Sequence, residues 1–225
     1  MAASGSKILH LRCVEYARRF GVPLHVRSSF STNEGTWVLP DPEDKIKIQE
    51  GEPLEQPIIS GVAHDHSEAK VTIIGVPDIP GKAAQIFGVI AAAQANIDMI
   101  VQNISTRGSG ATDISFTLPM TETKHVLEAL NTAKPEIGFE DIEHNDEVGK
   151  LSLIGAGMRS NPGVSFTFFE ALHRAGVNVD MISTSEIRIS VVTDADKLND
   201  AVRAIHTAFD LDTDVEATVY GGTGR

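Results

Sequence analysis

Hydrophobic positions along the chain form a pattern that occurs twice. A short apolar run, 71–75 in the first copy and 151–155 in the second, predicts a buried or half-buried strand. A turn follows, and apolar residues at helical spacing then predict a helix over 83–96 and, in the second copy, over 164–176. The chain therefore contains an internal repeat, and the fold is best read from the repeat before any single motif is considered.

Each copy continues with two strands, a second helix and a closing strand. These elements are predicted at 97–104, 112–118, 121–133 and 139–143 in the first copy, and at 177–184, 187–193, 195–209 and 215–220 in the second. The order β-α-β-β-α-β is that of the ferredoxin-like, split βαβ plan. The sequence thus predicts an α+β protein with two ferredoxin-like βαββαβ units.

The two copies share one spacing and differ in two loops. Gly81 to Asn96 and Gly163 to Asn178 are both 15 positions apart, and each asparagine opens an Asn-x-Asp-Met-Ile box. The strand-to-helix loop is two residues longer in the second copy, and only the first carries a Gly- and Ser-rich stretch, 105–111, between its middle strands. Because loops carry specificity on a shared scaffold, we expect the two copies to bind different ligands.

The residues before the repeats have a pattern of their own. A helix is predicted from Ile8 to Phe20, closed by Gly21, and a strand is predicted over 23–28. The stretch 39–57 is rich in proline and charge and is interpreted as a linker. Because a lone helix–strand pair cannot bury its own apolar faces, we interpret the segment before the linker as the remnant of another domain.

Composition and charge narrow the function classes. The 225 residues are 41% hydrophobic and 22% charged, as in ordinary globular proteins. A formal charge of −12 argues against nucleic acid and anionic membranes as partners, and no apolar stretch reaches the roughly 20 residues of a membrane span. The N-terminus has no signal-peptide pattern, which indicates a cytoplasmic protein. The single Cys13 excludes an internal disulfide and is interpreted as a buried structural thiol.

The sequence contains no recognised catalytic motif. Phosphate-loop, G-x-S-x-G and His-Glu-x-x-His signatures are missing, and one cysteine cannot form a multi-cysteine metal site. His64 and His66 would share one face of a strand, but two ligands without a third make a weak metal site. We therefore predict no catalytic residue and no metal site.

One binding geometry is present in both copies. Where a strand turns through Pro-Gly into a helix, as at 78–81 and 160–163, unpaired helix amides can attract a carboxylate. An amino acid bound there would need an acceptor for its ammonium group and polar partners for its side chain, which Asp98, Gln102 and Asn103 offer in the first copy. The same residues are also consistent with a capped turn and an ordinary strand entry, so both interpretations stay open.

Several longer strings are more specific than these motifs. They read HVRSSFSTNEGT, SGVAHDHSEAKVTIIG, NIDMIVQNIS, TDISFT, GKLSLIGAGMRSNPGV and ISTSEIRIS. The repeat resembles the ACT domain, a ferredoxin-like module that binds small ligands, usually amino acids, between paired modules. Over nearly the whole chain, the strings resemble the C-terminal half of actinobacterial-type aspartate kinase (aspartokinase).

The resemblance implies a domain organisation. Residues 1–38 would be the end of a kinase domain, and 39–56 would be a linker. ACT domain 1 would span 67–148, and ACT domain 2 would be discontinuous, formed by 57–66 and 149–225. The two ACT domains would thus be interleaved, and they would pack in a dimer.

The resemblance also implies a function. Kinases of this type phosphorylate the β-carboxylate of aspartate with MgATP, on the route to lysine, threonine, methionine and isoleucine, and are inhibited by lysine and threonine. This chain would be the regulatory part, like the β subunit, forming a homodimer that associates with a catalytic α subunit. It would hold no cofactor, because MgATP would bind the absent kinase domain, and it would be inactive alone.

The family's effector-binding positions match two groups of residues. One face of the site is implied at Asp78, Ile79, Pro80, Gly81, Ala83, Asp98, Gln102, Asn103 and Ser105, and the other at Ser165, Asn178, Val179, Asp180, Ser185 and Glu186. The leading hypothesis is that these residues bind threonine and/or lysine for feedback inhibition of aspartate phosphorylation. The alternative is a stand-alone ACT-type amino-acid sensor that is not attached to a kinase.

Overall fold

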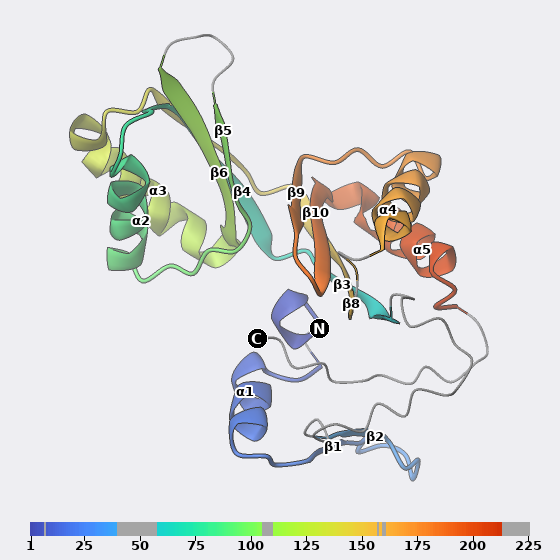
Figure 1. The fold of residues 1–225 in the computed structure, drawn as a ribbon. Helices are drawn as coiled ribbons and strands as arrows, with labels where there is room; N and C mark the ends of the chain where they lie inside the picture. The colour runs from blue at the N-terminus through green and yellow to red at the C-terminus, as the bar shows by residue number, and fades with distance from the viewer. Residues whose placement is uncertain (7, 40–57, 105–109, 157, 159–160, 213–225) are drawn as a thin grey trace.

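Two α/β units make up most of the structure. The computed structural model describes residues 1–6, 8–39, 58–104, 110–156, 158 and 161–212. Within these residues lie two four-stranded antiparallel sheets, each covered by helices on the face that points away from the other unit (Figure 1). We call the unit that holds the first repeat module 1 and the unit that holds the second repeat module 2. No helix in the described part of the chain is long and apolar enough to cross a membrane.

Module 1 has the strand order β5-β6-β4-β7. Its elements are β4 (Glu68–Pro77), α2 (Lys82–Ala92), β5 (Ile100–Ile104), β6 (Ala111–Pro119), α3 (Met120–Ile137) and β7 (Asp141–Asn145). Strand β4 alternates in burial, so that Val71 and Ile73 lie in the core while Lys70 and Thr72 point to the opposite face of the sheet. Helices α2 and α3 complete that core with Ile86, Ile90, Val126 and Leu130.

Module 2 has the strand order β3-β8-β10-β9. Its elements are β3 (Ile58–Asp65), β8 (Val148–Ala156), α4 (Pro162–Arg174), β9 (Met181–Thr184), β10 (Arg188–Asp194), the 3₁₀ turn η2 (Ala195–Lys197) and α5 (Leu198–Ala208). The edge strand β3 precedes module 1 in the chain, yet it pairs with β8. The chain therefore passes from module 2 to module 1 and back, which is the interleaved arrangement. The closing strand predicted at 215–220 lies outside the described residues.

The strand and helix types match the predictions, but several boundaries differ. Helix α2 spans Lys82–Ala92 where 83–96 is predicted: it begins directly after Gly81, whose φ of 98° excludes it from a right-handed helix, and it ends before Gln94, whose φ is 56°. Strands β5 and β9 begin at Ile100 and Met181, later than predicted, although the amides of Asp98 and Asp180 still donate to the carbonyls of Thr117 and Val192 on the neighbouring strands. Helix α3 continues through Pro135, where the buried side chain of Ile137 holds its last turn against the core.

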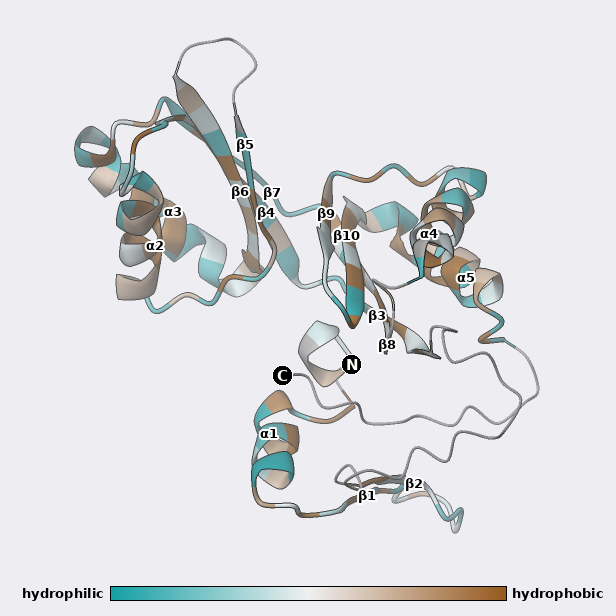
Figure 2. Cartoon of the chain, in the orientation of Figure 1, coloured by the Kyte–Doolittle hydropathy of each residue, from teal (hydrophilic) through white to brown (hydrophobic). Residues whose placement is uncertain are grey.

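The N-terminal segment buries little of its apolar surface. It consists of the 3₁₀ turn η1 (Ala2–Ser4), α1 (Leu11–Arg19), and the strand pair β1 (Leu24–Val26) and β2 (Thr36–Val38). Ala17 is buried on α1, whereas Phe20 and Phe30 are 67% and 99% exposed. Figure 2 shows hydrophobic positions on this segment as well as on the strands and helices of the modules. Cys13 is exposed, so the expectation of a buried thiol is wrong.

Candidate functional site

Helix α4 begins at Pro162, two residues before the predicted start, and residue 160 of the predicted turn lies outside the described residues. Pro162 is the first residue of the helix, a position where its missing amide costs no hydrogen bond. Asn161 is the N-cap residue, and the amide of Gly163 donates to its Oδ1 over 3.1 Å. The amide of Val164 donates to the carbonyl of Asn161 over 3.2 Å, so the amides of Gly163 and Val164 have partners and the expectation that they are unpaired is wrong.

A cavity of about 380 Å³ opens at this turn in module 2. Its lining comes from the turn before α4, from α4 itself, from the end of β9 and from β10: Met158, Asn161, Ser165, Thr184, Ser185, Glu186 and Ile189. Met158 and Ile189 are buried and supply apolar surface, whereas the other side chains supply hydroxyl groups, an amide and one carboxylate. A cavity with this lining suits a small ligand that has both an aliphatic part and charged groups.

Three of the six predicted residues of module 2 line this cavity, namely Ser165, Ser185 and Glu186. The other three lie near it in sequence but make other contacts: the carbonyl of Asn178 accepts from Thr193 Oγ1 over 2.6 Å, Val179 packs against the core, and Asp180 Oδ2 lies 3.1 Å from Lys70 Nζ. The match to the family's positions thus identified three polar residues that line the cavity, but it did not reveal the other contacts that Asn178, Val179 and Asp180 make.

Sequence reasoning did not select the remaining lining residues individually. Asn161 was part of the predicted turn, and its place directly before Pro162 is the signal of an N-cap. Thr184 directly precedes two predicted residues on the same strand end. Met158 and Ile189 carry no chemical signal, because a buried apolar side chain in a cavity wall has the same sequence pattern as any core residue.

The predicted residues of module 1 lie on an exposed turn and on β5. Asp78, Ile79 and Pro80 are exposed, and the amide of Asp78 donates to the carbonyl of Gly110 over 2.9 Å. None of the module 1 residues lines the cavity of module 2. Gly81 caps α2, Ala83 packs partly buried against the core, Gln102 and Asn103 are exposed on β5, and Ser105 lies outside the described residues.

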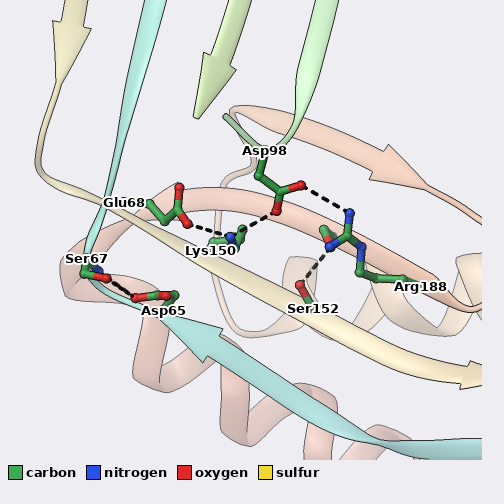
Figure 3. Close-up of polar contacts among 8 residues, drawn as sticks. Asp65, Ser67, Glu68, Asp98, Lys150, Ser152 and Arg188 are labelled. Carbon is green, nitrogen blue, oxygen red and sulfur yellow. Dashed lines mark hydrogen bonds and ion pairs between the residues drawn. The ribbon is translucent and has the colours of Figure 1, made fainter. Parts of the chain in front are cut away.

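Asp98 binds two cations of module 2. Its Oδ2 lies 3.1 Å from Lys150 Nζ, and its Oδ1 lies 3.4 Å from Arg188 Nη2. Lys150 also donates to Glu68 Oε1 over 2.7 Å, so that it lies between two carboxylates of module 1 (Figure 3). Asp98 was predicted from the repeat as an acceptor for a ligand, and the ammonium group that it accepts in this structure is that of Lys150.

The ionisation of this cluster follows from its geometry. Burial alone would raise the pKa of Asp98, but the charge and hydrogen bond of Lys150 and the charge of Arg188 outweigh it, so that the pKa lies below its ordinary value. Burial alone would lower the pKa of Lys150, but Glu68 and Asp98 outweigh that effect and raise the pKa. Both groups are therefore charged at neutral pH.

The described residues contain no cluster of three or more His, Cys, Asp or Glu side chains that could hold a metal ion. The rings of His64 and His66 do lie close together, with centroids 5.7 Å apart. Two imidazoles alone leave most of a coordination sphere unfilled. The candidate site is therefore the cavity of module 2, where hydroxyls, an amide and a carboxylate converge.

Comparison with known proteins agrees with this architecture. The family model described as "ACT domain" matches residues 71–133 and 151–209. The aspartokinase of Mycolicibacterium smegmatis is 55% identical over 225 residues, which are 100% of this chain and 52% of that protein. The chain thus spans about half the length of the curated relatives it matches.

Solved structures support the same assignment. One structure of aspartokinase alpha and beta subunits is 43% identical and has a TM-score of 0.63, covering 68% of this chain and 99% of that one. The regulatory subunit of aspartate kinase from Thermus flavus is 37% identical, with the same TM-score of 0.63 and the same coverages of 68% and 99%. The chain therefore belongs to the ACT-domain family, within the regulatory region of aspartokinases.

Proposed function

We propose that this chain binds threonine and/or lysine in the cavity of module 2 and thereby carries feedback inhibition of aspartate phosphorylation. The observation that supports the proposal is the lining of the cavity, where one carboxylate, one amide and three hydroxyl groups surround an apolar floor. A free amino acid has matching groups, namely an ammonium, a carboxylate and an aliphatic side chain. The volume of about 380 Å³ is near the lower end for ligand sites, which favours one small molecule.

Each part of the amino acid has a partner of suitable chemistry. The carboxylate of Glu186 attracts the ammonium group, and the start of α4 attracts the carboxylate through the positive end of the helix dipole. Ser165, Thr184 and Ser185 offer hydroxyl groups that can donate to or accept from a polar side chain. Met158 and Ile189 contact its aliphatic carbons.

We propose further that a second copy of the chain completes the effector-binding site. The predicted residues of module 1, from Asp78 to Gly81 and on β5, lie on exposed surface outside the cavity. In a homodimer, this surface of one protomer would close the module 2 cavity of its partner. Threonine should then shift the protein toward the dimer, which sedimentation velocity with and without threonine measures; an unchanged distribution would contradict the bridging role.

The proposed catalytic partner is the α subunit of aspartokinase, which would hold MgATP and aspartate. The segment 1–38 leaves Phe20 and Phe30 exposed, and its resemblance to the end of a kinase domain supports a kinase chain as the partner that would cover them. The chain alone should form no aspartyl phosphate from aspartate and MgATP. A pull-down with full-length aspartokinase from the same source separates this proposal from a stand-alone sensor, which would capture no kinase.

Calorimetry with threonine and with lysine tests the effector site directly. Glu186→Gln should weaken binding by about tenfold, since the amide oxygen can still accept from the ammonium group but lacks the negative charge that strengthens the contact, and Ser165→Ala should weaken it less. Glu170→Gln is the matched control, because Glu170 lies on α4 but pairs with Arg174 outside the cavity. If neither amino acid binds the unaltered chain, the proposed function is wrong.

A further inference from the structure

The two modules of one chain touch through equivalent positions of the repeat. Lys70 and Lys150 are the same residue of the first strand in each copy, and Asp98 and Asp180 are the same residue of the Asn-x-Asp-Met-Ile box. Lys150 Nζ lies 3.1 Å from Asp98 Oδ2, and Lys70 Nζ lies 3.1 Å from Asp180 Oδ2. Each lysine therefore reaches the aspartate of the other module, as in a two-fold symmetric dimer interface.

The backbone links between the modules repeat the same symmetry. Between β3 and β4, the amide of Ser67 donates to Asp65 Oδ1 over 2.8 Å. Between β7 and β8, the amide of Glu147 donates to Asn145 Oδ1 over the same 2.8 Å. The two links thus have equivalent turns, and any difference between the two halves of the interface must come from side chains.

The two halves of the interface differ in burial and in the number of their ionic contacts. Lys150 is only 3% exposed and binds both Glu68 and Asp98, and Arg188 adds a second cation to Asp98 (Figure 3). Among the residues that the structure describes, the other half has one ion pair, between Lys70 and Asp180, whose side chains are 23% and 29% exposed.

The repeat itself explains this inequality. The position that corresponds to Glu68 is Val148 in the second copy, which has no carboxylate to offer Lys70. The position that corresponds to Arg188 is Asp113 in the first copy, and its carboxylate accepts from the amide of Gly75 over 2.9 Å. Asp98 is bound by a second cation, Arg188, whereas the equivalent position in the first copy offers Asp180 no cation.

Between the two halves lies a small apolar contact. Met99 and Met181, again equivalent residues, pack with Val148 and Val192 and are buried. Methionine side chains adapt to changes in packing more readily than branched ones. Such a contact can adapt to a change of angle between the modules. The ionic groups on its two sides oppose that change to different extents.

We propose that the modules pivot about the Lys150 cluster and separate at the Lys70–Asp180 pair, and that an amino acid in the module 2 cavity biases this motion. A partly exposed single pair is weak and is screened by salt, whereas the more buried Lys150 cluster combines three ionic contacts and is screened less. Asp180 directly precedes β9, and Thr184 at the other end of this short strand lines the cavity. A ligand that contacts the end of β9 thus acts on the strand that carries the weak pair.

The second half of this inference rests on the proposed function, and the first half does not. An effector can shift the pivot only by the difference between its affinities for the two arrangements. The pivot itself depends on the contacts between the modules and is testable without any ligand. The two parts can therefore fail separately.

Pairs of spin labels measure the pivot. With Cys13→Ser as background, cysteines at Gln85 on α2 and His173 on α4, both exposed, report the distance between the modules. Lys70→Gln should broaden the distance distribution and raise the ratio of separated to closed protein by about two- to fivefold, as expected for a partly exposed pair. The exchange of both charges, Lys70→Glu with Asp180→Lys, should restore the original distribution.

Two further measurements decide between the outcomes. Glu170→Gln removes an ion pair within α4 and should leave the distances unchanged. Calorimetry on Lys70→Gln should show a change of about two- to fivefold in the affinity for threonine or lysine. Unchanged distances in Lys70→Gln would overturn the pivot. Unchanged affinity in a variant with altered distances would overturn the coupling of the pivot to the cavity. A lack of binding to the unaltered chain would refute both the proposed function and this coupling, and the distance measurements would still decide the pivot.

Discussion

Removal of the Lys150 ammonium group is the most direct test of what holds the two modules together. Lys150→Met keeps the length and the apolar part of the side chain but leaves Glu68 and Asp98 without their shared cation. The side chain of Glu68 is 12% exposed, so water cannot readily replace the lost partner. Asp98 is 32% exposed and keeps Arg188 at 3.4 Å, so its loss is smaller.

The expected cost follows from these exposures. Breaking a buried ion pair by removal of one partner costs about 3–5 kcal/mol, because the remaining charge stays buried. Since one of the two carboxylates retains a second cation, we expect the lower end, about 3 kcal/mol. The additional change Glu68→Gln removes the stranded charge and should recover part of this loss.

Urea unfolding followed by circular dichroism measures the effect. With a slope of about 1–3 kcal/mol/M, the midpoint of Lys150→Met should fall by about 1–3 M. Lys124→Met is the matched control, because Lys124 is exposed on α3, and its effect should stay within about 0.5 kcal/mol. If Lys150→Met and this control have equal midpoints, the ionic cluster does not hold the modules together and the reasoning from burial is wrong.

Three other outcomes follow from the structure. Because the pKa of Asp98 is lowered in the folded protein, the ionised carboxylate stabilises the fold at neutral pH and this contribution is lost on acidification. The difference in stability between the unaltered chain and Asp98→Asn should therefore shrink below about pH 4. Thermal melts at several pH values measure it, and a difference that widens at low pH would contradict the reasoning. Gly149→Ala should lower the melting temperature, at a cost of about 1–3 kcal/mol, because its new Cβ would lie 2.5 Å from Leu198 Cδ2; no change in calorimetry would refute the clash. Gly88→Ala in α2 meets nothing within 4 Å and should stabilise the protein by about 1 kcal/mol in the same experiment.

The local pattern of the sequence predicted most helices and strands of the modules. Alternating and helical periodicities predict which side chains of an element are buried, and the burial of these side chains stabilises β4 and α4. The errors lie at the ends of the elements, where the conformation or burial of a single residue determines the boundary. Helix α2 ends at Ala92, four residues before the predicted end, and Gln94 just beyond it has a φ of 56°; α3 continues past Pro135 to Ile137, whose side chain is buried in the core of module 1.

The candidate site was predictable only in part. The position of Ser165 in the first turn of α4 and of Glu186 after β9 follows from the repeat and its family resemblance, and both line the cavity. Asp98 has the same local pattern as a ligand-binding aspartate, but residues 52 and 90 positions away, Lys150 and Arg188, surround it. No local pattern contains that information, because the partners lie in the other module.

The sequence by itself determined the β-α-β-β-α order of both repeats, their family and the position of the turn before each first helix, since these depend on periodicity and on residues a few positions apart. The edge next to β8 is occupied by β3, which precedes module 1 in the chain, and the closing strand predicted at 215–220 lies outside the described residues. Only the tertiary structure decided that Lys150 is buried between two carboxylates while Lys70 has one partly exposed partner. The physical reason is that an ion pair depends on the residues around it. Lys150 has Glu68 as a second partner and Asp98 has Arg188, whereas the equivalent Val148 offers Lys70 no carboxylate and the equivalent Asp113 offers Asp180 no cation.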